Sequence, residues 1–421
     1  MERKKVLLIT YYWPPGGGAG VHRWLRFSKY FQELGADLTV YCPEDAVWQT
    51  TDAALVDQVP ESVTVIRRGI FEPQKYIGRK GTGIGFTQDK KAGPLKRLII
   101  WIRGNLLIPD SRKYWIKPST RFLRKYLTDH PEIDTLISTG PPHSLHLIAH
   151  NLKKSNGLKW IADFRDPWTQ IDFYQDLLPG KRADKKHKRL ERIVLASADE
   201  VVTVSNHCAY GLEEIVNRKV HVITNGFPFE ENPTKVKLDE KFTISHFGTM
   251  PFARNPRILW EALKSLLYHR PELTEHLEIH LVGSVDFNVI ASYEENGLKD
   301  FVTLVPNIPH NESVSAQKSS QLLLLSANQS GNIKGILTGK FFEYLAADRP
   351  IIGIGDKEGD LAAAFKDLNC GHFSGFEEKN SLESYLHKSF DHFLNGEIPL
   401  ETKGRDKYHS RSLAAKFIEL L

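Results

Sequence analysis

The first forty residues of the chain predict a β-α-β unit with parallel strands. Residues 6–10 form a short apolar run, which is typical of a buried parallel strand. A glycine-rich loop follows, and the next helix is predicted over residues 21–34, where Gly35 ends it. Residues 37–41 alternate in polarity as a second strand. A chain that begins in this way is expected to build a doubly wound α/β sheet.

Short apolar strands alternate with helical segments in two series. Polar residues around Pro228 and Pro233 separate them, and 421 residues exceed a usual single domain. We therefore predict two doubly wound, Rossmann-like domains, 1–225 and 226–404, which face each other across a cleft, with a closing helix over 405–421 that returns to the first. The remaining predicted strands are 63–67, 135–138, 158–162 and 200–204 in the first domain, and 242–248, 277–282, 302–305, 321–325 and 350–354 in the second.

Composition indicates a protein of the cytoplasm or of a membrane surface. Three widely spaced cysteines, Cys42, Cys208 and Cys370, fit free thiols better than a disulfide framework or a zinc site. Neither a secretory signal nor an apolar run of roughly 20 residues is apparent. The formal net charge of +5 is mild, but its distribution along the chain is uneven.

Residues 335–355 resemble the phosphate-facing start of a helix followed by a buried strand. Thr338 can cap this helix, and the free amides of Gly339 and Lys340, with the lysine ammonium, favour an anion. Glu343 lies about one turn later, where it can accept hydrogen bonds from a ribose. The alternative is an ordinary crossover helix in which Lys340 and Glu343 form a solvated ion pair.

The glycine run at residues 16–20 lies between the first strand and the first helix. Small residues there let backbone amides, such as those of Gly17 and Gly18, approach a ligand closely. The spacing matches neither the dinucleotide-binding fingerprint nor a P-loop, so ATP hydrolysis is not supported. The alternative is a flexible turn.

Several motifs in this order resemble the retaining glycosyltransferases of family 4, which have the GT-B fold. The pieces are the glycine loop, residues 198–205, residues 222–226, Gly248 with Arg254 and Asn255, the strand ending at Gly283, and residues 340–346. The resemblance implies that a sugar moves from a nucleotide-sugar donor with retained anomeric configuration. It also implies that the donor binds the second domain and the acceptor binds the first.

The resemblance assigns roles to individual residues of the donor site. Glu343 matches the glutamate that holds the donor ribose, whereas Gly335 stands where the family has another glutamate. Arg254 matches the cation that neutralises the departing diphosphate, and Thr338, Gly339 and Lys340 match its phosphate cradle, so Arg254 and Lys340 are expected to be catalytic. The remaining donor-binding residues that we expect are Gly17, Gly18, Gly248, Asn307 and Ile308.

No metal cofactor is expected. Fixed donors and cations can stabilise a leaving diphosphate, and the sequence lacks the Asp-x-Asp motif that holds a divalent ion at a diphosphate. His143, His146 and His150 share a helical face that superficially suggests zinc. Because no cysteine or carboxylate accompanies them, a solvated face is the preferred interpretation.

Acceptor-side residues are expected after two strands of the first domain. His143 follows the strand at 135–138 and is a candidate catalytic group, with a helix-capping or surface role as the alternative. Asp163, Arg165 and Asp166 follow the strand at 158–162 and can hold acceptor hydroxyls. The alternative is a structural network in which Arg165 pairs with one of the two aspartates.

Basic residues crowd between 75 and 125, where only Asp89 and Asp110 oppose them. Within this region, residues 95–107 predict an amphipathic helix with Leu95, Leu98, Ile99 and Ile102 on one face and Trp101 beside it. We expect contact with an anionic membrane, and no nucleic acid, because a nucleic-acid-binding motif is lacking. A core helix with a solvated basic face is the alternative.

Together these features predict a glycosyltransferase on the cytoplasmic side of the plasma membrane. Its acceptor would be a saccharide, attached to a lipid carrier, in cell-surface polysaccharide or glycolipid synthesis. Two alternatives remain open at this point. One is a nucleotide-sugar epimerase of the same architecture, and the other is a non-catalytic nucleotide-sugar-binding subunit, which Gly335 keeps open.

Overall fold

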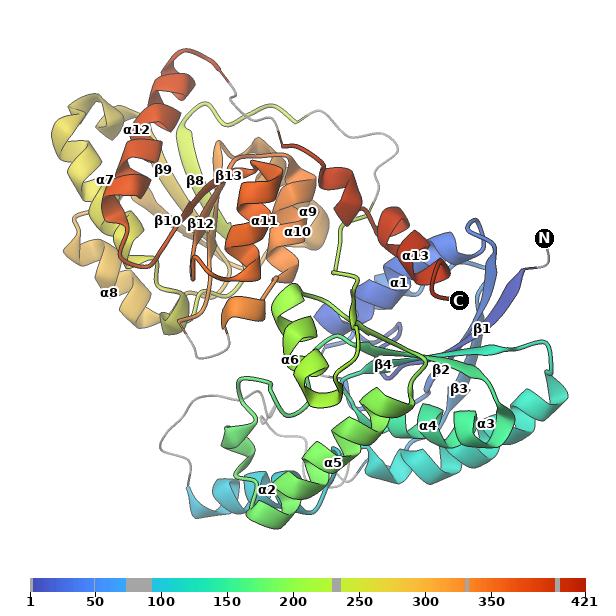
Figure 1. Ribbon diagram of the computed structural model, residues 1–421. Coiled ribbons are helices and arrows are strands. Elements are labelled where there is room, and N and C mark those ends of the chain that lie inside the picture. Colours follow the sequence, from blue (N-terminus) through green and yellow to red (C-terminus); the bar gives the residue numbers. More distant parts are fainter. Residues whose placement is uncertain (1–2, 49, 73–92, 229–235, 330–332, 398–401) are drawn as a thin grey trace. The chain divides into compact units, whose positions relative to one another are not determined.

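The structure is a computed structural model that describes residues 3–48, 50–72, 93–228, 236–329, 333–397 and 402–421. It divides into two compact units (Figure 1). Unit 1 comprises the chain up to Asn225 together with Ser410–Leu421, and unit 2 comprises Gly226–His409. Unit 2 thus extends beyond residue 404, because a short 3-10 turn at Arg405–Tyr408 belongs to it, and the closing helix begins only at Ser410.

Unit 1 contains a parallel sheet of seven strands in the order β3-β2-β1-β4-β5-β6-β7. The direction of winding reverses between β1 and β4, so the loops after these strands diverge and open a ligand-binding position at their carboxyl ends. The strands are β1 (Lys4–Ile9), β2 (Ala36–Pro43), β3 (Thr64–Arg68), β4 (Thr135–Gly140), β5 (Lys159–Phe164), β6 (Glu200–Thr203) and the two-residue β7 (His221–Val222), which the sequence did not predict.

Helices cover both faces of this sheet because its strands are apolar on both faces. Val6 and Leu8 of β1 face one core, which includes side chains of α1 and α13, whereas Leu7 and Ile9 face another, which includes side chains of α3 and α4. The two sets of helices lie on opposite sides of the sheet in Figure 1. The helices are α1 (Ala19–Phe31), α2 (Pro94–Asn105), α3 (Ile116–Asp129), α4 (Ser144–Asn156), α5 (Lys181–Ser197), α6 (Asn206–Val216) and α13 (Ser410–Ile418).

Unit 2 repeats the same plan with a parallel sheet in the order β10-β9-β8-β11-β12-β13. Its strands are β8 (Phe242–Phe247), β9 (Leu277–Val282), β10 (Val302–Val305), β11 (Leu322–Ser326), β12 (Ile351–Ile354) and β13 (Gly371–Ser374), of which only β13 was not predicted. Its helices are α7 (Arg257–His269), α8 (Phe287–Glu295), α9 (His310–Ser319), α10 (Gly339–Ala347), α11 (Asp360–Leu368) and α12 (Lys379–Leu394). The predicted α/β architecture with two doubly wound sheets is confirmed.

Two further features of the chain are the state of its cysteines and the length of its helices. Cys42, Cys208 and Cys370 are all free thiols, and the first and last of them are buried. In the part of the chain that the structure describes, every helix is too short or too polar to cross a bilayer.

The packing of α13 on α1 leads to a prediction about the folding stability of unit 1. Phe417 of α13 is fully buried, and its ring centroid lies 4.9 Å from that of Trp24 and 5.5 Å from that of Phe27, both on α1. Phe417→Ala should lower the free energy of unfolding of unit 1 by about 3–5 kcal/mol, measured by urea titration, since it leaves a cavity. Tyr268→Ala on α7, where the residue is 83% exposed, serves as the control and should change stability by less than about 0.5 kcal/mol. Equal midpoints for the two variants would contradict the packing role of α13.

Candidate functional site

In unit 2, the start of α10 is fixed to the end of β8. The buried hydroxyl of Tyr344 accepts a hydrogen bond of 3.0 Å from the backbone amide of Phe247, the last residue of β8. Thr338 caps the helix by accepting a bond of 3.4 Å from the amide of Phe341. The N-terminus of α10 therefore lies at the carboxyl end of the central strand, where its positive dipole end favours an anion.

Gly248 makes room for Lys340 at this position. Its φ of +110° belongs to a region that glycine favours, and a Cβ atom there would lie 3.0 Å from Cε of Lys340. The lysine ammonium forms an ion pair of 2.8 Å with Glu343, and both side chains are about one-third exposed. The ion pair of the alternative interpretation is thus present, but exposed pairs contribute little, so an incoming phosphate can displace Glu343 at small cost.

Arg254 brings a second cation to the same end of the sheet. It ends the 3-10 turn at Phe252–Arg254, and its Nε donates 2.7 Å to Oδ1 of Asn328, which follows β11. Burial lowers the pKa of Arg254. Burial also lowers the pKa of His246, on β8, to about 4, and the positive charges of Lys340 and Arg254 add to that decrease. His246 is therefore neutral, and two cations act on the same position.

The other predicted donor residues of unit 2 are divided between two places. Gly339 opens α10, and no described atom lies within 4 Å of the position that its Cβ would occupy, so its amide can be approached closely. Asn307 and Ile308 follow β10, two strands away from β8 in the sheet. Asn307 is exposed, and Ile308 packs against the apolar core of unit 2.

In unit 1, the glycine loop packs against the chain around Thr50. The amide of Gly17 donates 2.9 Å to the carbonyl of Thr50, and a Cβ on Gly17 would lie 2.9 Å from the hydroxyl of that threonine. Gly18 has a φ of +84° at the N-cap of α1. A Cβ on Gly16 would meet the ring of Trp48 at 2.9 Å. Close packing inside the protein thus explains why small residues stand at positions 16 and 17. The amide of Gly17 already donates a hydrogen bond within the protein.

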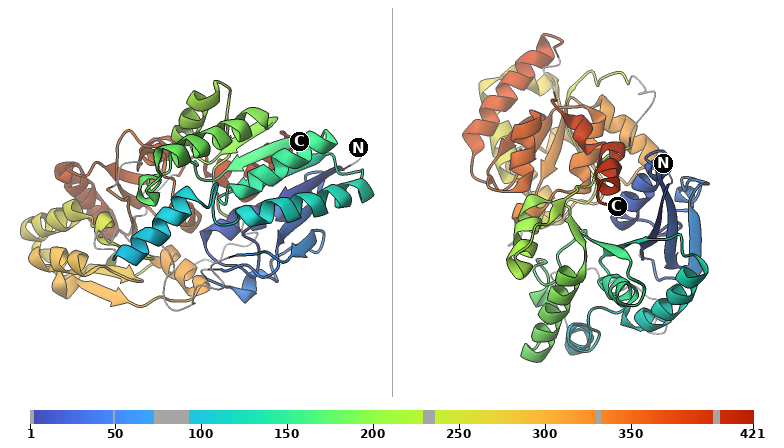
Figure 2. Two further views of the ribbon diagram at one scale, coloured as in Figure 1. Left: turned by 90° about the horizontal axis from the view of Figure 1, so that it is seen from below. Right: turned by 45° about the vertical axis from the view of Figure 1, so that its right-hand side comes forward.

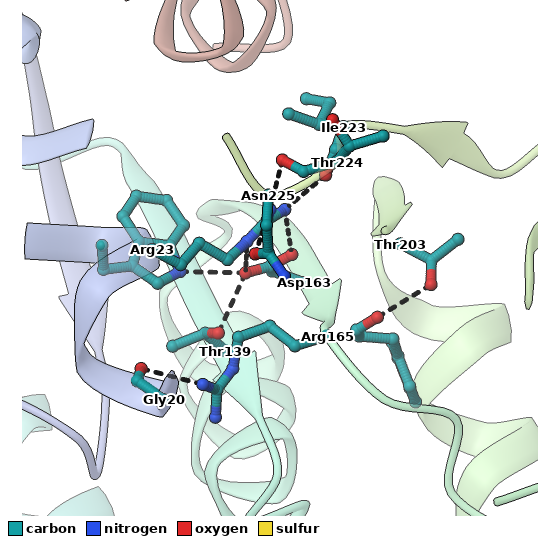
Figure 3. Close-up of polar contacts among 11 residues, drawn as sticks. Gly20, Arg23, Thr139, Asp163, Arg165, Thr203, Ile223, Thr224 and Asn225 are labelled. Carbon is teal, nitrogen blue, oxygen red and sulfur yellow. Dashed lines mark hydrogen bonds and ion pairs between the residues drawn. The ribbon is translucent and has the colours of Figure 1, made fainter. Parts of the chain in front are cut away.

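Asp163 is the centre of a buried polar network (Figure 3). Its carboxylate accepts bonds of 3.1 and 2.9 Å from Nε and Nη2 of Arg23, and of 2.9 Å each from the indole of Trp24 and the hydroxyl of Thr139. Both side chains of the ion pair are at most 1% exposed. Asp163 is therefore saturated by the protein, and its partner is Arg23 rather than the predicted Arg165.

Arg23 also holds the segment through which the chain leaves unit 1. Its guanidinium donates 2.8 Å to each of the carbonyls of Ile223 and Thr224, and 3.3 Å to the side chain of Asn225 (Figure 3). Sequence reasoning missed Arg23, because a single arginine in a predicted helix has no local signal of such a role. Its partner is 140 residues away along the chain.

Arg165 and Asp166 occupy different environments. Arg165 donates 2.8 Å to the carbonyl of Gly20 and 2.6 Å to that of Pro141, and its guanidinium lies 5.2 Å from the ring centroid of Tyr12. Its role is therefore to join the glycine loop to the loop after β4. Asp166 is exposed beyond the end of β5.

His143 is buried, which contradicts a surface role. It precedes α4, but the cap is made by Asp110, which accepts bonds of 2.8 Å from both the amide and the hydroxyl of Ser144. The ring of His143 stacks on that of Trp168 at a centroid distance of 4.7 Å and an angle of 1°. Burial and the nearby His146 lower its pKa, so the imidazole is neutral.

The expected solvated histidine face is wrong. His146 is fully buried and bonds at 2.8 Å to the hydroxyl of Ser138, and only His150 is half-buried. Among the described residues, no group of three or more His, Cys, Asp or Glu side chains is arranged to hold a metal ion. These histidines follow β4, all of whose residues are buried, and α4 packs against that strand.

Two Rossmann-like units, each with polar residues at the carboxyl ends of its strands, define a two-domain α/β protein. No protein-family model matches the sequence, and no curated protein matches it either. Solved structures do match over nearly their full length. Sucrose-phosphate synthase from Thermosynechococcus elongatus is 13% identical with a TM-score of 0.61, and the match covers 99% of this chain and 98% of that one.

Two further structures agree with this match. HepE from Anabaena, solved with UDP, is 12% identical with a TM-score of 0.59, and TarM from S. aureus is 9% identical with a TM-score of 0.60. Each match covers 99% of both chains. The chain therefore has the GT-B fold.

We predict that removing the charge of Asp163 causes a large loss of folding stability. Asp163→Asn leaves the buried guanidinium of Arg23 without its counter-charge, and the free energy of unfolding should fall by about 3–5 kcal/mol in urea titrations. Glu240→Gln, which removes the exposed partner of Lys237, is the control and should leave the midpoint unchanged. A similarly small effect at Asp163 would refute its structural role.

The burial of His146 leads us to predict that unit 1 becomes less stable in acid. Burial lowers its pKa to about 3, compared with an ordinary value of about 6.5 in an unfolded chain. Below pH 6.5 the unfolded chain gains a proton that the folded chain excludes, so stability should fall by about 1.4 kcal/mol per pH unit toward pH 3. Above pH 6.5 His146 is neutral in both states and does not make the folding stability depend on pH. Unfolding measured from pH 7 to 4 should show a shallower fall for His146→Gln than for the control His269→Gln, which changes an exposed histidine.

Proposed function

We propose that this protein is a retaining glycosyltransferase of family 4. In this proposal, unit 2 binds a nucleotide-sugar and unit 1 binds a saccharide acceptor, attached to a lipid carrier, in cell-surface polysaccharide or glycolipid synthesis. The enzyme would work in the cytoplasm, at the inner face of the plasma membrane.

The observation that carries the proposal is the pair of cations at the start of α10. The side chain of Lys340 lies next to Gly248, and Arg254 belongs to the same loop after β8, so that the charges of both cations act on His246 of that strand. Both face the end of β8, where the capped helix N-terminus adds a fixed positive pole. A diphosphate is the ligand whose charge matches this arrangement, and Glu343, freed from Lys340, is placed one turn along to bind a ribose.

These groups also suit the chemistry of transfer. The bond between the anomeric carbon and the phosphate oxygen breaks, and a bond from that carbon to an acceptor oxygen forms on the same face of the sugar. The acceptor proton passes to the leaving phosphate oxygen. Arg254 and Lys340 stabilise the charge that develops on the diphosphate, so the proposal needs no metal ion.

Proteins of the same fold support this choice of ligand. HepE has been solved with UDP, with UDP and glucose, and with UDP-glucose. TarM has been solved with fondaparinux, α-GlcNAc-glycerol and UDP. We transfer from these structures only the class of donor, a nucleotide-sugar, and the class of acceptor, a saccharide.

On the acceptor side, we propose different tasks for the four candidate residues. Asp166 is exposed and is the carboxylate available to an acceptor hydroxyl. His143 is neutral and can exchange a hydrogen bond with the acceptor without carrying charge. Asp163 and Arg165 are bonded within the protein and act by fixing the ends of β5 and β4, after which Asp166 and the buried His143 lie.

Turnover distinguishes this proposal from its alternatives. The protein is incubated with a panel of nucleotide-sugars, with and without membrane lipid extract, and nucleotide release and labelled lipid are followed. Release that depends on the extract supports transfer. Isomerisation of the donor without extract would instead identify an epimerase, and binding without any turnover would identify a non-catalytic subunit, consistent with Gly335 in place of a glutamate.

Glu343→Ala should weaken binding of the nucleoside diphosphate by about tenfold to a hundredfold in calorimetry, because a charge-assisted bond to the ribose is lost. The control is Glu272→Ala, which changes a half-exposed glutamate that pairs with Arg270 just before β9, at the amino ends of the strands and therefore opposite the candidate site. Unchanged affinity in Glu343→Ala would remove the donor-site assignment.

A further inference from the structure

Helices α2, α3, α4 and α5 form one continuous layer on a single side of the unit 1 sheet. α3 packs on α4, α4 on α5, and α5 on α2. The view from below in Figure 2 looks onto this layer. Its four helices contain sixteen Lys and Arg residues against three carboxylates, an excess of thirteen positive charges, whereas the whole chain carries +5. The positive charge of the protein is therefore concentrated on this layer.

Helix α5 contributes the largest share of this charge, seven of the sixteen cations, and it lies outside the basic region predicted from the sequence. All seven of its cations are exposed, and of its two carboxylates only Asp184 forms an ion pair, with Lys188. Glu191 is buried and accepts hydrogen bonds from Thr169. On α4, Lys153 pairs with Asp199. Most of the charge in the layer is thus not neutralised by the protein itself.

A groove of about 570 Å³ between α3 and α4 gathers four of these cations. Lys117, Arg121 and Arg124 follow at intervals of one helical turn along α3, and Lys154 faces them from α4. Asn151 and Ser155 add polar groups, and no carboxylate lines the groove. Within the described chain, none of the four cations has an ion pair. Such a groove is suited to a phosphate group, which accepts several charge-assisted bonds at once.

Helix α2, which packs on α5 at the other end of the same layer, shows what kind of phosphate-bearing partner fits. Leu95, Leu98 and Trp101 recur every three residues and are 70%, 52% and 43% exposed. α2 is held to α5 at Gly104, whose carbonyl lies 3.2 Å from the ring nitrogen of His187. The core-helix alternative is therefore wrong for these three side chains. Exposed apolar side chains in the same layer as a groove of cations match the interface of a bilayer, which offers both anionic headgroups and hydrocarbon, and do not match a nucleic acid.

We propose that the α2–α5 layer docks on an anionic lipid bilayer, with headgroup phosphates in the groove between α3 and α4 and the apolar side chains of α2 in the hydrocarbon boundary. This deepens the proposed function, because it gives a surface to the membrane association suggested there. It does not depend on turnover, so it can fail or succeed independently of the enzymatic assignment.

The test measures binding of the full-length protein to vesicles of phosphatidylcholine with increasing phosphatidylglycerol. Arg121→Gln, Arg124→Gln and Lys154→Gln are combined in one groove variant. Each cation near an anionic surface is worth about fivefold in binding, so the groove variant should bind roughly a hundredfold more weakly. A charge-matched control combines Lys264→Gln, Lys366→Gln and Lys388→Gln, which are exposed lysines of unit 2, and should bind as the wild type does. Equal losses in both variants would show that only net charge matters and would overturn the groove.

A second variant, Leu95→Ser with Leu98→Ser, separates a bilayer from a soluble polyanion. It keeps every charge, so it should lose vesicle binding while binding soluble tripolyphosphate as the wild type does. Wild-type protein that binds tripolyphosphate or single-stranded RNA but not the vesicles would overturn the proposal. Nucleoside diphosphate binding, measured by calorimetry, should be the same in all variants, which shows that unit 2 is intact.

Discussion

The arrangement of the strand ends in unit 1 depends on the hydrogen bonds and the ion pair made by the buried carboxylate of Asp163. It accepts four hydrogen bonds, two from Arg23 and one from Trp24, both on α1, and one from Thr139 on β4. The guanidinium of Arg23 also donates to the carbonyls of Ile223 and Thr224. A charge at most 1% exposed is tolerated only when it is paired and fully bonded. The network therefore fixes the carboxyl ends of two strands and the exit of the chain as one arrangement.

The six-stranded sheet of unit 2 follows the same order as the first six strands of unit 1, but two cations at its strand ends, Lys340 and Arg254, remain partly accessible. The hydroxyl of Tyr344, a neutral group, ties α10 to β8, so Lys340 and Arg254 are not consumed by the anchoring. Their side chains remain partly accessible, and Lys340 is engaged only in an exposed ion pair. The two units therefore differ in the burial of these cations: Arg23 of unit 1 is fully bonded inside the protein, whereas Lys340 and Arg254 of unit 2 stay partly accessible, as the proposed donor site requires.

Sequence patterns predicted what depends on neighbours along the chain. Periodicity and apolar runs located eleven of the thirteen strands that the structure describes, and failed at β7, which has two residues, and at β13, whose sequence Gly-His-Phe-Ser contains no apolar run. The cap at Thr338 and the position of Lys340 were also local signals. The pairing of Arg23 with Asp163, the packing of Gly17 on Thr50, and the summation of charge over four helices are set by tertiary structure, and no window of sequence contains them.

The position of α13 has a consequence for biosynthesis. The sheet of unit 1 is complete at Val222, but Phe417, which closes the core over Trp24 and Phe27, is made almost two hundred residues later. A ribosome therefore exposes an unfinished first domain for as long as it synthesises the whole of the second. The core between α1 and the sheet is thus completed only when the last helix has been made, after every residue of the second domain.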